Sequence, residues 1–152
     1  MPLLNYTTTV PASRTIGQVQ GLLVEAGARQ IMAEYDDVGR ATGIAFVVQT
    51  GYGPRSFALP VNASRVQAVL GRDKKVPVRY QTPEHAERVA WRILKDWLEA
   101  QLAIIATEMV TLDQVMLPYM QDGGSGRTVY ELYVDRQLAL PAGEHGTREE
   151  RQ

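Results

Sequence analysis

One long helical pattern, from Thr82 to about Thr107, most constrains what this chain can fold into. Thr82 is a favourable N-cap, and Pro83 occupies the first helical position, where the missing backbone N–H costs nothing. Apolar residues then recur at spacings of three and four, which predicts a broad buried stripe along one face of the helix. Trp91 and Trp97 belong to this stripe, so we interpret both as packing residues. The rest of the chain must therefore supply a large apolar surface for this helix to cover.

Before this helix, four segments have the β-branched composition or the alternation typical of strands. They are Tyr6–Val10, Gln30–Asp36, Thr42–Thr50 and Ser56–Val61. Tight turns join the last three, which predicts antiparallel pairing. Ser13 and Asn62 are the expected N-caps of two short helices, and Gly27 is the expected end of the first.

After the long helix, the chain is expected to form short helical pieces. Thr111 and Thr128 each open a capping-box pattern. The segment 128–138 also alternates like a strand, and we favour the helix because of the capping box. Residues 141–152 form a polar stretch without a core-forming pattern, which predicts a disordered tail after a single domain of residues 1–140.

These elements predict an α+β fold in one two-layer domain. We expect an antiparallel four-stranded sheet, covered on one face by the long helix and by the helix that starts near Ser13. The chain has 152 residues and no cysteine, which excludes disulfides and fits a reducing cytoplasm. No signal peptide and no apolar run of membrane-spanning length is visible, so we expect a cytoplasmic protein that does not enter a membrane.

Little in the sequence points to catalysis, and we predict a protein that is not an enzyme and has no cofactor. The only histidines, His85 and His145, have no neighbours that suggest a triad or a metal pair, and His85 is expected to lie exposed on the long helix. Glu34, Asp36 and Asp37 carry oxygen ligands of the kind that divalent cations prefer. Turn chemistry explains the two aspartates equally well, so no metal site is predicted.

The charge of the chain is unevenly placed. The net charge is −1, but between Gly53 and Arg92 there are eight basic and three acidic residues. Tyrosine beside arginine or lysine is used in proteins to stack bases and to bind phosphates. The candidate ligand-binding residues are therefore Tyr52, Arg55, Lys75, Arg79, Tyr80, Arg88 and Arg92. The alternative is that these charges are a solvated surface and that the tyrosines pack at its rim.

Parts of the chain resemble a group of known proteins. The stretch 89–103 (VAWRILKDWLEAQLA), followed by 116–120 (MLPYM), resembles small uncharacterised phage and prophage proteins. The segments 5–8 (NYTT) and 34–36 (EYD) are also similar to that group, and the resemblance extends to about Tyr133. It implies an origin in a phage or mobile element and a place in the host cytoplasm. It implies no activity, and no functional residue is carried over.

Two functional hypotheses follow. The first is a non-enzymatic binding protein for a nucleotide or nucleic-acid ligand, single-stranded nucleic acid included. One form of this hypothesis is a protein that counteracts host defence by sequestering such a ligand. The second is an oligomeric protein-interaction module for a host or phage protein. From Leu102 to Ala106 the long helix is apolar on all sides, which predicts that this end forms an interface, first of all in a homo-oligomer.

Overall fold

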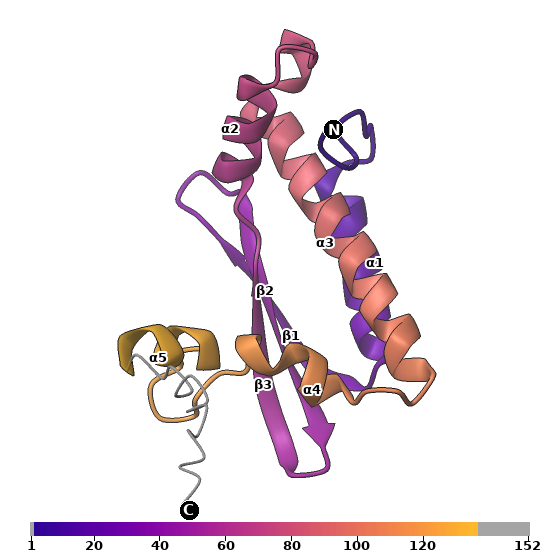
Figure 1. Cartoon of the computed structure of the whole chain (residues 1–152), viewed down its shortest axis with the longest axis vertical. Helices are drawn as coiled ribbons and strands as arrows, with labels where there is room; N and C mark the ends of the chain where they lie inside the picture. Colours follow the sequence, from indigo (N-terminus) through magenta and orange to yellow (C-terminus); the bar gives the residue numbers. More distant parts are fainter. Residues whose placement is uncertain (1, 137–152) are drawn as a thin grey trace, which may run out of the picture.

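The computed structural model describes residues 2–136 and shows an α+β fold built on a three-stranded antiparallel sheet (Figure 1). The elements in chain order are α1 (Ala12–Glu25), β1 (Ala28–Tyr35), β2 (Ala41–Thr50), β3 (Gly53–Pro60), α2 (Ala63–Arg72), the 3-10 helix η1 (Val78–Tyr80), α3 (Pro83–Ala106), α4 (Leu112–Met116), the 3-10 helix η2 (Leu117–Tyr119) and α5 (Val129–Arg136). The predicted tail, residues 141–152, lies outside the described residues.

The sheet has the order β1-β2-β3, and its inner face carries most of the core. Ile44 lies opposite Ala33 on one side and Leu59 on the other. Phe46 lies opposite Phe57, and their rings stack with centroids 5.4 Å apart. The four of these side chains that belong to β2 and β3 are buried on one face, because alternate side chains of a strand point to the same face.

Helices α1 and α3 lie together on the inner side of the sheet (Figure 1). Their fully buried side chains include Val19 and Leu23 from α1 and Trp91 and Leu98 from α3. The indole N–H of Trp91 donates to the backbone oxygen of Ala41 over 3.3 Å, so this large side chain is buried with its polar atom satisfied. The prediction that the long helix and the first helix cover one face of the sheet is confirmed.

The four-stranded sheet predicted from the sequence is wrong, because Tyr6–Val10 is not a strand. β-branched composition shows that a segment fits a pleated surface beside another strand, and it is not by itself a backbone preference. Here the segment turns back on itself, with a hydrogen bond from the N–H of Thr8 to the oxygen of Asn5 and a positive φ of 63° at Asn5.

The N-terminal segment packs on helices instead of pairing with the sheet. Tyr6 packs against a small buried cluster formed by Leu70, Val76 and Val89. The side-chain amide of Asn5 donates to Asp96 of α3 over 2.8 Å. Contacts between distant parts of the chain therefore override the local strand signal.

The predicted helix ends are mostly correct. The Thr82 hydroxyl accepts from the N–H of His85 over 3.2 Å, the Asn62 side chain caps α2, and the Thr111 capping box is complete. The exception is α1, where Pro11 takes the N-cap position and Ser13 lies inside the helix. The segment Val129–Arg136 is a helix, as we favoured, and the last two residues of the predicted helix, 137 and 138, lie outside the described residues.

Candidate functional site

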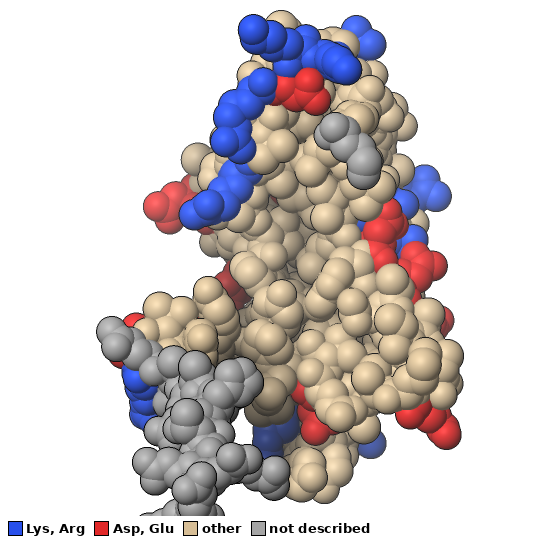
Figure 2. Space-filling view, viewed as in Figure 1, with Lys and Arg blue, Asp and Glu red and all other residues tan. Residues whose placement is uncertain are grey.

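Basic side chains gather at the end of the molecule that is formed by α2 and the loop after it (Figure 2). We call this surface the basic end and define it by five exposed residues: Arg65, Arg72, Lys74, Lys75 and Arg79. Two of them lie on α2, and the other three lie on the loop and on η1.

The charge of the basic end is hardly compensated. The acidic residue between these cations, Asp73, accepts a hydrogen bond from the backbone N–H of Lys75 over 2.9 Å. None of the five basic residues forms an ion pair with any residue in the range 2–136. A cluster of unpaired cations produces a local positive potential, although the whole chain is nearly neutral.

Tyr80, one of the predicted ligand residues, is packed among other side chains. The guanidinium carbon of Arg79 lies 4.7 Å from the centre of its ring. The ring of Tyr6 meets it edge-on at 5.8 Å, and the ring of His85 lies 4.9 Å away. Tyr80 therefore positions Arg79 through a cation–π contact, and its ring is not free to stack on a base.

Arg88 joins this group from α3. With Thr8, Thr9, Arg79 and Tyr80 it lines a shallow hollow of about 380 Å³. The hollow opens beside the basic end. Four of the seven candidate residues predicted from the sequence therefore lie at or next to one surface: Lys75, Arg79, Tyr80 and Arg88.

The other three candidate residues lie elsewhere. Tyr52 is 80% exposed in the turn between β2 and β3, at the opposite end of the molecule from α2, and Arg55 follows it there (Figure 1). The Arg55 side chain donates to the backbone oxygen of Pro54 over 3.0 Å. Arg92 turns towards α1 and donates to the side-chain oxygen of Gln18 over 2.6 Å. The predicted residues therefore do not form one site.

His85 is buried, contrary to the prediction that it lies exposed on the helix. Only 4% of its surface is exposed, and its Nε2 atom lies 2.5 Å from the backbone oxygen of Tyr6. Because a backbone oxygen can only accept, Nε2 must carry the proton. His85 therefore fastens the N-terminal segment to α3, a role that the helical spacing alone did not reveal.

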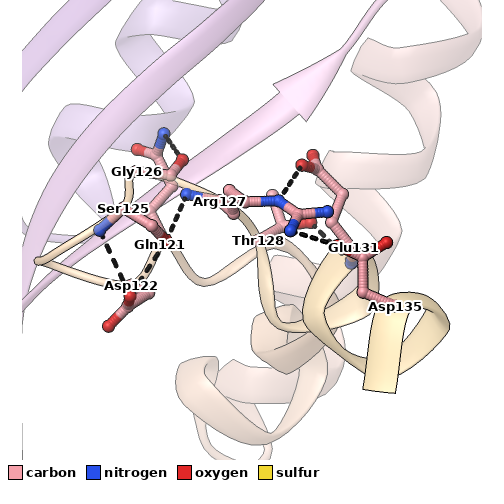
Figure 3. Close-up of polar contacts among 8 residues, drawn as sticks. All are labelled: Gln121, Asp122, Ser125, Gly126, Arg127, Thr128, Glu131 and Asp135. Carbon is pink, nitrogen blue, oxygen red and sulfur yellow. Dashed lines mark hydrogen bonds and ion pairs between the residues drawn. The ribbon is translucent and has the colours of Figure 1, made fainter. Parts of the chain in front are cut away.

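A hydrogen-bonded turn at residues 121–128 leads into α5 (Figure 3). Asp122 accepts from the backbone N–H and from the hydroxyl of Ser125, over 3.2 and 2.9 Å. These bonds favour the charged form and lower the pKa of Asp122 below its ordinary value. Gln121 fastens the turn to the sheet, because its side-chain oxygen accepts from the Ser56 hydroxyl over 2.7 Å.

Arg127 lies just before α5 and pairs with two carboxylates along this helix (Figure 3). Its guanidinium pairs with Asp135, and its Nε lies 3.7 Å from Glu131. The hydrogen bond between Arg127 and Asp135 raises the pKa of the arginine and lowers that of the aspartate. The turn and the start of α5 thus form one polar network.

A cleft that no sequence pattern predicts lies between this network and the outer face of the sheet. α5 lies on the side of the sheet away from α3 (Figure 1). The cleft between α5 and the sheet has a volume of about 590 Å³. Gly43 and Ala58 line it from β2 and β3, and Gln121, Thr128 and Tyr130 line it from the turn and α5. No sequence motif marks these residues, because they come together only when α5 folds back on the sheet.

Between residues 2 and 136, no group of three or more His, Cys, Asp or Glu is placed to hold a metal ion. The helices of this region include none with the length and apolarity needed to cross a membrane. Comparison with protein-family models, with curated proteins and with solved structures found no match in any of the three.

Proposed function

We propose that the protein is a non-enzymatic binding protein for the phosphates of a nucleic acid or nucleotide, and that the basic end is its binding surface. The observation that carries the proposal is the set of five exposed basic residues without an ion-pair partner among the described residues. Phosphate binding by such a surface releases counterions, which makes it favourable at low salt.

The layout of the cations favours a nucleic-acid backbone over a single nucleotide. Arg65 and Arg72 are seven residues apart on α2, so they lie on one face about 10 Å apart along the helix axis. Measured along the axis of a double helix, that distance spans about three nucleotides of one strand, at about 3.4 Å each. The surface is exposed, as suits a ligand that lies along it. In the phage context that the sequence resemblance implies, we extend the proposal to a protein of the host cytoplasm that sequesters a ligand of host defence.

The test is the salt dependence of binding. Binding is measured by the fluorescence anisotropy of a labelled short single-stranded DNA at several salt concentrations. Arg72→Ala/Lys75→Ala should weaken binding and reduce the slope of log K against log salt by about 1.4, or about 0.7 for each lost phosphate contact. Cyclic and linear mononucleotides, tested as competitors, should compete only weakly.

A matched control removes the same charge elsewhere. Arg14 and Arg29 are exposed, lie outside the basic end and have no ion pair in the described part of the chain. Arg14→Ala/Arg29→Ala should leave the slope unchanged. If both double variants weaken binding equally, or if the wild type does not bind DNA at low salt, the basic end is only a solvated surface.

A second candidate function is protein interaction through the far end of α3. Here Ile104 is 39% exposed, Met109 71% and Leu117 48%. Ile104 and Met109 are five residues apart at the end of α3 and in the loop after it, and exposed apolar side chains that are close together favour an interface. We propose a homo-oligomer as the first partner and a host protein as the other.

Sedimentation tests this candidate. The wild type should sediment above the 16.9 kDa of one chain. Met109→Lys should return it to the monomer, whereas Val38→Lys, at a residue 72% exposed in the turn between β1 and β2, should not. A wild-type protein that stays monomeric at micromolar concentration would rule out the homo-oligomer.

A further inference from the structure

The cleft beneath α5 has the size and the lining of a ligand site. Its volume of about 590 Å³ lies within the range of small-molecule sites, about 300–1,000 Å³. Pro118, Tyr119 and Tyr130 contribute apolar and aromatic surface, and Gln121 and Thr128 contribute polar groups that are held by the network in Figure 3. Such a mixture of apolar surface and a few fixed polar groups is typical of binding sites.

The charge of the cleft is negative. Glu34 lines it from β1 and Glu131 from α5, and its lining residues within the range 2–136 include no lysine or arginine. Glu34 has no ion-pair partner within residues 2–136, while Glu131 shares Arg127 with Asp135. One arginine does not neutralise three carboxylates, so a phosphate would be repelled here and a cation attracted.

A glycine in the middle of the sheet, Gly43, lies beside Glu34. A Cβ atom added at Gly43 would lie 3.7 Å from Oε2 of Glu34 and 3.1 Å from the backbone oxygen of Leu59. The φ angle of Gly43 is not positive, so the backbone itself does not require glycine there. Glycine inside a strand lowers its stability and often marks a close approach of a ligand or another backbone. At Gly43 the missing Cβ leaves room for the backbone of β3, and the Glu34 carboxylate lies at ordinary van der Waals distance beside it in the cleft.

We infer that this cleft binds an organic cation, an ammonium or guanidinium group on an apolar stem. The carboxylate of Glu34 pairs with the charge, and the stem lies against Tyr119 and Tyr130. The side-chain oxygen of Gln121 and the Thr128 hydroxyl lie near enough to the cleft to accept hydrogen bonds from the cation. The site is separate from the basic end in both place and sign of charge, so neither proposal depends on the other.

Nuclear magnetic resonance with a matched pair of probes tests this inference. The first probe is an acetylated, amidated Ala-Arg-Ala tripeptide, and the second has neutral citrulline in place of arginine. The arginine probe should shift the backbone amides of Gly43, Ala58 and Thr128, and the citrulline probe should not. Spermidine forms a third arm. Tighter binding of spermidine than of the tripeptide identifies a free amine as the source of the cation, and the reverse identifies a side chain of a polypeptide.

Two variants and a control distinguish binding in the cleft from general electrostatic attraction to the protein surface. Glu34→Gln should weaken the binding of the arginine probe about fivefold, which is the contribution of one partly exposed ion pair. Ala58→Leu should obstruct the cleft without a change of charge and should also weaken binding, with the fold checked by circular dichroism. Glu25→Gln removes an exposed carboxylate on α1, outside the cleft, and should change nothing. Equal binding of both tripeptides, or an equal loss in Glu25→Gln, overturns the inference.

Discussion

Leu94 and Leu98 offer a sharp test of how α3 is buried, because they lie one turn apart on the same helix. The sequence places both on one apolar row. In the structure Leu98 is 0% exposed in the core between the helices and the sheet, whereas Leu94 is half-buried and lines a groove at the edge of α2. Truncation of the two side chains should therefore lower the free energy of unfolding by unequal amounts.

The expected magnitudes follow from burial. Leu→Ala in a well-packed core costs about 2–5 kcal/mol, since it loses transfer free energy and leaves a cavity. We expect about 3–4 kcal/mol for Leu98→Ala and about 2 kcal/mol for Leu94→Ala, because part of the Leu94 side chain stays in contact with water. A domain of this size changes its Tm by about 2–4 °C per kcal/mol, so Leu98→Ala should melt about 10 °C lower.

Urea unfolding measures these differences, with the fluorescence of Trp91 and Trp97 and far-ultraviolet circular dichroism as two probes. Coincident transitions from both probes would justify a two-state free energy. Equal losses for the two variants, or a loss below about 1 kcal/mol for Leu98→Ala, would refute this assignment of the buried face of α3.

Three further outcomes are expected. Thr111→Ala removes the capping box of α4 and should lower the free energy of unfolding by about 1 kcal/mol, measured by urea unfolding against Thr9→Ala. Gly126→Ala places a side chain at a φ of 72° and should cost about 1–2 kcal/mol in the same assay, whereas Gly124→Ala, where φ is not positive, should cost less. Asp122 and Asp135 have lowered pKa values, so their stabilisation is present above the ordinary aspartate pKa of 3.8 and is lost as the pH falls below it. Amide hydrogen exchange should accordingly show the turn at 121–128 opening below that pH before α3 does, and uniform protection would contradict this.

The sequence by itself determined the elements that depend on local interactions. The Thr82 and Asn62 caps and the Thr111 capping box each join residues three positions apart, so the pattern that predicts them is complete within one helical turn. The hairpin of β2 and β3 was predictable for a similar reason, because its strands are adjacent in the chain and alternate clearly. The sequence also placed four of the seven candidate ligand residues at or next to one surface, since these follow one another in the loop between α2 and α3 or lie near the start of α3.

Only the tertiary structure decided the features that join distant segments. The segment Tyr6–Val10 has the composition of a strand, but contacts with α3 at His85 and Asp96, 79 and 91 residues away, hold it as a turn. The cleft likewise requires Glu34 and Gly43 from the sheet to meet α5, which begins more than eighty residues later. Local patterns carry no information about which distant surfaces meet, because the free energy of packing depends on the shape and burial that the whole fold creates.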